Sequence, residues 1–465
     1  MTRRNACLLL FSLVLAARIS HSGILWVEEA YPGAAAIQIL HGKVPYRDFV
    51  FDKPPLSAMV YLMWGSMTGW MQRAAGALYV MACCWMAHRL ARKLWGEQEG
   101  WYAALLMGFF LTFDTPSAVM ALAPDLLLVA PHLAALLFAA RRQAFLAGLL
   151  AGIGFLIHVK ALIVLAVCLL WLPSIGVALG FVTVIGAGTV VLAAIGALPG
   201  FWEQVWIWGA EYSRDSFLNQ PLKEAAARTA AWLGFHATAV GGAIVYFWKE
   251  RNRQSQKILL WTALSLASVF VGWRFFPRYY FQVLPPVVLA ASRGFSLLSS
   301  RRALALASLL LVPVMRFGPR YVQLASDLLR AQNHDWADVA MNRDSIAGTT
   351  HMRQHIREGD TILVWGYRPD ILVYTRLPLG APFLDSQPLT GVLADRHLMR
   401  SSPTFPDLAR ENRAKLTAMS PTWVIDGLGP YNRELALDGY QDLREWLGRY
   451  EVLARTNGSV IYRLR

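Results

Sequence analysis

The sequence predicts an all-α multi-pass membrane protein that carries a small soluble α/β domain at its carboxyl-terminal end. Hydrophobic residues make up 56% of the 465 residues and charged residues only 16%, whereas soluble globular proteins contain about a quarter charged residues. The mean hydropathy is +0.38. The 44 lysines and arginines outnumber the 30 acidic residues and occur in short clusters between apolar segments. Such clusters are typical of membrane topology signals rather than of a nucleic-acid-binding surface.

Membrane spans are assigned from apolar segments of about 20 residues, with clusters of Arg and Lys marking the cytoplasmic side. The first span starts after Arg3 and Arg4 and runs from Ala6 to about Val27, and we favour an uncleaved span over a signal peptide. Residues 55–69 are expected to lie along the outer interface or to re-enter rather than to cross. The remaining predicted spans are 71–91, 101–115, 126–140, 144–158, 160–174, 176–198, 229–248, 258–273, 278–294 and 302–316. The total is about eleven, which places the amino terminus in the cytoplasm and the carboxyl terminus outside.

The composition changes at about Gly318, where the hydrophobic runs shorten and charged residues become evenly mixed. We therefore divide the chain into a membrane domain, residues 1–317, and an extracytoplasmic α/β domain, residues 318–465. The first outer loop of the membrane domain covers residues 22–70 approximately. Alternation of strand-like and helix-like patterns supports the α/β assignment. The expected strands are 361–367, 371–374, 422–426 and 459–463, and the expected helices are 335–357, 404–418 and 433–448.

Cysteine usage and nucleotide motifs exclude several classes of protein. All four cysteines lie within apolar stretches, so the sequence indicates neither a disulfide framework nor a cysteine-rich zinc site. It contains no Gly-x-x-x-x-Gly-Lys motif, so energy from nucleotide hydrolysis is not implied.

A pair of carboxylates, Glu28 and Glu29, follows the first span on the outer side. Acidic side chains at a membrane boundary are costly to bury and mark a functional site by default. The alternative is a solvated pair that caps a helix starting near Pro32.

The next polar segment is a rigid loop with two turn signals. Tyr46, Arg47 and Asp48 form its first part, and Asp52 and Lys53 lie directly before two prolines. An ordinary interfacial turn with extended basic side chains would have the same composition. Lys53 is the stronger candidate for function, because a fixed ammonium at the interface suits a lipid phosphate.

Asp125 lies at the outer mouth between two predicted spans, and His158 and Lys160 lie between two later ones. Asp125 could equally cap the helix that follows Pro124. His158 and Lys160 either line an outer cavity or mark a short turn. Lys160 is the better candidate, because a lysine in so apolar a sequence usually has a partner.

The last feature combines Arg274, Arg278 and Tyr279 at the outer end of another span. Two arginines four residues apart can hold phosphate oxygens while the interleaved aromatic rings lie at headgroup depth. An aromatic belt explains the rings but leaves the arginines on the side that the positive-inside rule disfavours.

The segment from Glu28 to Leu56, with Gly42-Lys43-Val44-Pro45-Tyr46-Arg47-Asp48 and Asp52-Lys53-Pro54-Pro55, resembles the first outer loop of GT-C glycosyltransferases. The most similar groups are the protein-mannosyltransferases and aminoarabinose transferases. Asp125, the segment Gly148–Lys160, Arg274 to Tyr279 and the terminal domain with Val364-Trp365-Gly366 match the order and spacing of that family. The resemblance covers essentially the whole chain.

This resemblance implies an enzyme of the bacterial inner membrane that transfers a sugar from a polyprenyl-phosphate donor, with inversion, to a lipid, glycan or protein acceptor on the outer (periplasmic) face. The general base is Glu28 or Glu29, because the family usually has Asp-Glu at this pair, and Asp125 orients the acceptor or assists. Cations for the donor phosphate are Lys53, Lys160, Arg274 and Arg278. In some members the residue at Asp52 helps to hold a divalent metal, but the sequence offers no convincing second ligand, so no cofactor is indicated.

Two other classes of protein remain as alternatives. A transporter or flippase of lipid-linked sugars is expected to show an internal repeat and polar residues at the membrane midplane, and neither is evident. A non-catalytic scaffold would leave the outer acidic and cationic residues unexplained.

Overall fold

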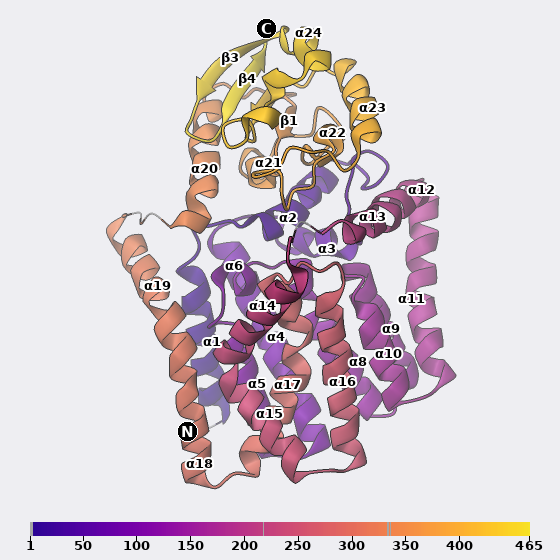
Figure 1. Cartoon of the computed structure of the whole chain (residues 1–465), viewed down its shortest axis with the longest axis vertical. Helices are drawn as coiled ribbons and strands as arrows, with labels where there is room; N and C mark the ends of the chain where they lie inside the picture. Colours follow the sequence, from indigo (N-terminus) through magenta and orange to yellow (C-terminus); the bar gives the residue numbers. More distant parts are fainter. Residues whose placement is uncertain (1–2, 217, 333, 335) are drawn as a thin grey trace.

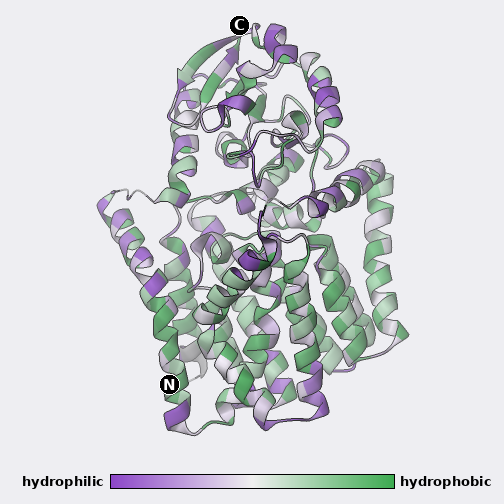
Figure 2. Ribbon diagram, viewed as in Figure 1, coloured by the Kyte–Doolittle hydropathy of each residue, from purple (hydrophilic) through white to green (hydrophobic). Residues whose placement is uncertain are grey.

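The computed structural model describes residues 3–216, 218–332, 334 and 336–465. A helical bundle carries a smaller domain at one end, and the amino terminus lies at the opposite end of the bundle from the carboxyl terminus (Figure 1). Hydrophobic residues dominate the bundle, whereas the terminal domain is mixed (Figure 2). The bundle contains α1 (Arg3–Ile19), α4 (Trp70–Leu94), α5 (Glu97–Phe110), α8 (Val129–Ala140), α9 (Ala144–Ile157), α10 (Ala161–Trp171), α11 (Ile175–Ala194), α15 (Ala237–Lys249), α16 (Arg253–Phe270), α17 (Leu284–Ser296), α18 (Ser300–Ala307), η4 (Ser308–Leu310) and α19 (Leu311–Arg330).

Shorter elements cover the end of the bundle that faces the terminal domain. These elements position the polar segments that the sequence singled out. They are α2 (Val27–Leu40), α3 (Leu56–Met59), η1 (Val60–Trp64), α6 (Pro116–Val119), α7 (Pro124–Leu127), α12 (Leu198–Phe201), η2 (Trp202–Ile207), α13 (Trp208–Arg214), α14 (Pro221–Phe235) and η3 (Pro277–Gln282). Residues 55–69 contain two of the short elements, α3 and η1, and form no span.

The expected number of about eleven spans is not confirmed. Among the described residues, only Ile175–Ala194 and Ser300–Arg330 form helices long and apolar enough to cross a membrane alone. The expected span 229–248 is instead a bent pair, α14 and α15, with an angle of 88° at their junction. His236 lies at this junction, buried, and its Nδ1 is 2.9 Å from the carbonyl of Trp232. An apolar segment reveals hydrophobicity but not such a break, so sequence reasoning could not find it.

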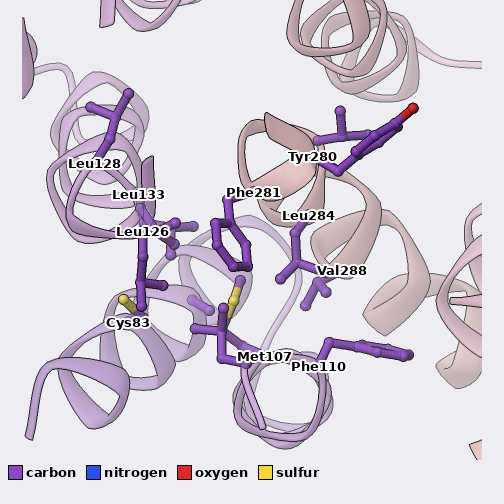
Figure 3. Close-up of a cluster of buried hydrophobic side chains, with 14 of the residues drawn as sticks. Cys83, Met107, Phe110, Leu126, Leu128, Leu133, Tyr280, Phe281, Leu284 and Val288 are labelled. Carbon is purple, nitrogen blue, oxygen red and sulfur yellow. The ribbon is translucent and has the colours of Figure 1, made fainter. Parts of the chain in front are cut away.

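One continuous hydrophobic core lies inside the bundle, directly beneath the outer polar residues. Figure 3 shows Leu126, which follows Asp125, in the same buried cluster as Phe281 and Leu284. The bundle is also closely packed where α9 crosses α11. A Cβ atom at Gly148 or Gly180 would collide with the backbone of the other helix. Because the apolar neighbours of the polar residues are fixed in this core, the polar residues are held in place as well.

The terminal domain contains a four-stranded sheet in the order β1 (Ile362–Trp365), β2 (Trp423–Asp426), β4 (Val460–Leu464) and β3 (Tyr450–Arg455). Strands β1 and β2 are parallel, with Val364 opposite Ile425, and the other pairs are antiparallel. The helices of this domain are α20 (Ala340–Arg353), α21 (Pro369–Thr375), α22 (Gln387–Thr390), α23 (Pro406–Thr417) and α24 (Arg444–Leu447), with 3₁₀ turns η5 (Ala337–Val339), η6 (Arg433–Leu435), η7 (Leu437–Gly439) and η8 (Gln441–Leu443).

Two of the elements expected for this domain were wrong. Residues 371–374 lie in α21 rather than in a strand, because Pro369 opens a helix and a short apolar run fits either structure. The expected helix 433–448 consists of 3₁₀ turns followed by a short helix. Strand β3 was not foreseen, because its exposed pattern lacks apolar alternation. The domain boundary expected at 317/318 falls within α19, which continues to Arg330.

The terminal domain binds the first outer loop directly. Helix α21 packs on α2, and Val373 shares a hydrophobic cluster with Tyr31 and Ile37. The Gln38 side chain donates to the carbonyl of Leu377 at 3.1 Å and accepts from the Leu379 N–H at 2.9 Å. The loop that carries the candidate residues is therefore held between the bundle and the terminal domain.

Candidate active site

The two carboxylates of the first outer loop have different surroundings. Helix α2 begins at Val27 rather than near Pro32, so Glu28 and Glu29 both lie in its first turn. Successive side chains on a helix point about 100° apart. Glu28 retains 23% side-chain exposure and Glu29 none. The helix thus separates a carboxylate that can meet a substrate from one that cannot.

Glu29 belongs to a buried network. Arg73 of α4 lies 2.6 Å from its Oε1, and Gln72 donates to its Oε2 at 2.6 Å. Arg73 also donates to the carbonyls of Ile24 and Met120. The structure therefore directs Glu29 into the protein, where it fixes the position of α2 against α4.

Glu28 faces Arg278, which lies in the first turn of η3. The distance from Arg278 Nη1 to Glu28 Oε1 is 2.7 Å. The same guanidinium places its Nε 3.6 Å from Oδ2 of Asp125. One cation thus joins two carboxylates from α2 and α7.

Asp125 is buried and carries two further basic partners. The Lys160 ammonium lies 3.2 Å from its Oδ1, and Nε2 of His158 lies 3.4 Å from the same atom. The Lys160 ammonium also lies over the Tyr279 ring, 3.3 Å from its centroid. Asp125 is not only a helix cap. No side chain caps the amino-terminal end of α7, and the Asp125 carboxylate points to these cations instead. Glu28, Asp125, His158, Lys160, Arg278 and Tyr279 form what we call the outer cluster.

A buried chain of hydrogen bonds fixes the backbone of Asp125. Trp261 Nε1 can only donate, and it lies 2.8 Å from Nε2 of His132. The proton of His132 is therefore on Nδ1, 3.2 Å from Oε1 of Gln282. The amide nitrogen of Gln282 in turn donates to the carbonyl of Asp125 at 3.2 Å. The direction of every bond follows from the indole N–H, and the last bond holds the Asp125 backbone against η3. Sequence reasoning missed it, because an isolated His or Gln in an apolar run carries no signal.

Lys53 lies in the segment that links α2 to α3. It pairs with Asp52 at 2.7 Å and keeps 37% side-chain exposure. Tyr31 and Tyr367 pack against each other with ring centroids 5.5 Å apart, and the Lys53 ammonium is 5.9 Å from the Tyr31 ring. Tyr367 comes from the terminal domain and was not foreseen.

Asp385 is a buried acidic residue of the terminal domain, and its carboxylate interacts with that of Asp52 in the first outer loop. Burial, together with the nearby Asp52 carboxylate, raises the pKa of Asp385 to about 7. Its carboxylate accepts the N–H of Gln387 at 2.7 Å. Sequence reasoning missed Asp385 because an Asp in a loop far along the chain looks like any solvated residue.

Three of the expected loop residues shape the loop rather than join the cluster. The Tyr46 hydroxyl donates to the Lys53 carbonyl at 2.6 Å and thereby holds that backbone. Arg47 pairs with Asp48 at 2.8 Å on the surface. Hydrogen bonds from Arg47 and from the Val44 N–H lower the pKa of Asp48 to about 2.

Arg274 forms its hydrogen bonds with residues outside the outer cluster, although the sequence grouped it with the phosphate-binding residues. It is buried, and its Nε is 2.6 Å from Oδ2 of Asp395 in the terminal domain. Its remaining nitrogens donate to the carbonyls of Gly272, Tyr212 and Asp215. Each of the three nitrogens of this guanidinium has a protein acceptor, so Arg274 connects the bundle to the terminal domain.

The chemistry of the outer cluster is cationic and carboxylate-based. Within the described part of the chain, no group of three or more His, Cys, Asp or Glu side chains could hold a metal ion. Asp52 has Lys53 as its salt-bridge partner. The cations of the outer cluster suit an anionic group, and the partly exposed Glu28 carboxylate is a proton acceptor by its chemistry.

Comparison with known proteins gave structural relatives only. No family model matches the chain, and no curated protein sequence matches it. ArnT from Cupriavidus metallidurans bound to undecaprenyl phosphate has a similar structure, with a TM-score of 0.65 and 14% identity over 99% of this chain and 98% of ArnT. The apo form of ArnT gives a TM-score of 0.63 and 15% identity over the same shares. An Archaeoglobus fulgidus oligosaccharyltransferase with a tethered acceptor peptide gives 0.50 and 10% identity, over 97% of this chain and 72% of the other.

The fold is that of the GT-C membrane glycosyltransferases, as the sequence resemblance predicted. The chain is similar in structure to ArnT over nearly the full length of both proteins.

Proposed function

We propose that this protein transfers a sugar from a polyprenyl-phosphate donor to an acceptor at the outer face of the membrane. The observation that carries the proposal is the pairing of the partly exposed Glu28 with Arg278, next to Asp125 and Lys160. Sugar transfer from a lipid phosphate needs a base for the acceptor and cations for the leaving phosphate. The undecaprenyl phosphate bound to ArnT supports a donor of this chemical class.

In this proposal Glu28, not Glu29, is the general base. Glu29 is fully buried and paired with Arg73, whereas Glu28 is accessible. The Glu28 carboxylate accepts the proton of the acceptor hydroxyl while the oxygen of that hydroxyl bonds to the anomeric carbon of the sugar. The bond from that carbon to the phosphate oxygen breaks on the opposite face, which inverts the configuration. Both electrons of that bond leave with the polyprenyl phosphate.

The cations have a corresponding role. Arg278, Lys160 and Lys53 stabilise the phosphate as its negative charge grows. Binding of the donor phosphate draws Arg278 from Glu28, because a phosphate offers several acceptor oxygens to one guanidinium. This exchange leaves the Glu28 carboxylate free to act as a base. Asp125 keeps Lys160 and His158 in position.

We further propose that the bundle crosses the inner membrane of a bacterium with its amino terminus in the cytoplasm. The shorter bundle helices then cross together with the two long ones, and the terminal domain lies in the periplasm. Tag accessibility tests this orientation, and a cytoplasmic terminal domain would contradict it.

The decisive experiment follows lipid-linked donors in vesicles that contain the purified protein. A panel of polyprenyl-phosphate sugars is added with candidate acceptors, and the lipid extract is analysed by mass spectrometry. Wild type is expected to convert one donor to free polyprenyl phosphate, which a flippase would not release. Glu28→Gln is expected to lose this conversion, and Glu211→Gln, an exposed control on α13, to retain it. Wild type that neither consumes nor binds any donor would overturn the proposal.

A further inference from the structure

A cavity lies where the last helix of the bundle leads into the terminal domain. Its volume is about 330 Å³. The turn after α1, the end of α19 and the first residues of α20 enclose it, and none of its lining residues belongs to the outer cluster. Ile24, Leu324, Leu328 and Ile346 give it apolar walls, and Asp327 and Trp336 add polar atoms.

Asp327 is a buried carboxylate that is only half satisfied. Its Oδ1 accepts a hydrogen bond from Gln323 at 2.8 Å and lies 3.6 Å from the exposed His334. Its Oδ2 is buried and has no hydrogen-bond partner among the described residues. Asp327 also lies in the last turn of α19, where the helix dipole disfavours negative charge. A buried carboxylate in such a place requires a cationic donor.

Donors without acceptors lie on the same side of α19. Arg320 precedes Asp327 by seven residues, which is about two helical turns on one face. Its guanidinium packs 4.8 Å from the ring centroid of Trp336 and pairs through Nη1 with Asp338 at 3.0 Å. Within the described chain, Arg320 Nε and Nη2 and Trp336 Nε1 are buried without an acceptor. A guanidinium with two nitrogens that lack acceptors, beside an indole N–H, is suited to phosphate oxygens.

The depth of these residues identifies the kind of ligand. Arg320 and Asp327 lie in the last turns of the long apolar helix Ser300–Arg330, and Trp336 follows that helix. Val322 and Leu329 of the same turns are strongly exposed apolar side chains. A helix with such a surface is in contact with lipid, and its last turns lie at the level of the headgroups.

We propose that this cavity binds the zwitterionic headgroup of an aminophospholipid such as phosphatidylethanolamine. The ammonium group donates to Oδ2 of Asp327, and the phosphate accepts from Nε1 of Trp336. Arg320 packs on the Trp336 ring next to the cavity rather than in its wall, and its charge favours the phosphate. The apolar walls receive the start of the acyl chains. A choline headgroup carries the same charges but no N–H, so it leaves Oδ2 unsatisfied. The site therefore selects ethanolamine over choline lipids, and it is independent of the proposed sugar transfer.

Native mass spectrometry of the purified full-length protein tests this selectivity. The protein in detergent is mixed with phosphatidylethanolamine, its N,N-dimethyl derivative or phosphatidylcholine, all with identical acyl chains. Wild type is expected to retain the first two lipids, which have an N–H, about tenfold or more over phosphatidylcholine, since a hydrogen bond to a charged group is lost with choline. Equal retention of all three, or retention of none because water satisfies the polar atoms, would overturn the proposal.

Three variants locate the site. Asp327→Asn is expected to abolish the preference for ethanolamine, and Trp336→Phe to weaken binding of all three lipids without changing the preference. Arg330→Gln removes an exposed cation from the same helix and is expected to change neither. Free phosphoethanolamine is added in a parallel sample, and displacement of the lipid by it at equal concentration would show that the acyl chains contribute nothing. An unchanged preference in a folded Asp327→Asn protein would contradict the assignment.

Discussion

Glu28 and Arg278 are separated by 250 residues, yet their side chains meet at 2.7 Å. The contact joins the first turn of α2 to the first turn of η3, and the same guanidinium reaches towards Asp125 at 3.6 Å. In the proposed reaction, the donor phosphate attracts Arg278 away from the partly exposed Glu28 carboxylate. Glu28 is then free to act as a base, so its release depends on binding of the donor. This relationship links phosphate binding to proton transfer in the proposed reaction.

Replacement of Arg278 tests that link. Arg278→Gln is expected to reduce kcat/KM for the donor by about a hundredfold, because it removes charge that stabilises the leaving phosphate. Arg278→Lys retains the charge but cannot contact two groups at once, so it is expected to give an intermediate value. Steady-state kinetics over a range of donor concentrations measures both. Arg214→Gln, at an exposed position on α13, is the control, and wild-type kinetics in Arg278→Gln would contradict the proposed role.

The buried pair of Glu29 and Arg73 is expected to support the fold rather than the reaction. Glu29→Ala leaves a buried guanidinium without its carboxylate, which costs about 3–5 kcal/mol of folding free energy. Thermal unfolding in detergent is therefore expected at a clearly lower temperature than in wild type. Glu28→Gln, one residue away, is expected to unfold close to the wild-type temperature. Equal unfolding temperatures for all three proteins would refute this division of roles.

The relay from Trp261 to Asp125 predicts a cost for loss of one N–H group. Trp261→Phe keeps an aromatic ring but leaves Nε2 of the buried His132 without its donor, a loss of about 1–3 kcal/mol. His132→Leu removes the partner itself, so adding Trp261→Phe to it is expected to cost less than it costs in wild type. A double-mutant cycle from unfolding temperatures measures the difference. Strictly additive effects would show that the relay is not coupled.

Asp385 predicts a pH dependence of stability. Its pKa in the folded protein is about 7, above the value of about 3.9 for an ordinary aspartate. The folded state therefore binds more protons between these values, and the contribution of Asp385 to stability falls as the pH rises from about 4 to about 7. Asp385→Asn cannot ionise and is expected to gain stability relative to wild type over this range. Unfolding temperatures from pH 5 to 8 test this expectation, and a constant difference between the two proteins would contradict it.

The predictability of individual residues depended on local sequence patterns. Lys53 before two prolines and Arg278 after an aromatic run were recognisable, because rigid or misplaced basic residues stand out from an apolar sequence. Arg274 has the same local pattern as Arg278, but the backbone of its neighbours Trp273 and Phe275 is left-handed. Arg274 points instead to Asp395, a partner that no local pattern could reveal. Tyr367 and Asp385 gave no signal, because their significance comes only from docking of the terminal domain on α2.

The sequence by itself determined that the chain is a membrane protein with a terminal α/β domain and a GT-C-like first loop, because hydrophobic periodicity and motif spacing are local properties. It also predicted that carboxylates and cations gather at one end of the bundle, the end that carries the terminal domain. Only the tertiary structure separated Glu28 from Glu29, paired Asp125 with Lys160 and turned Arg274 into a domain contact. Those outcomes depend on which side chains meet after the helices pack, and distances between residues far apart in the chain are fixed by the core rather than by neighbours in sequence.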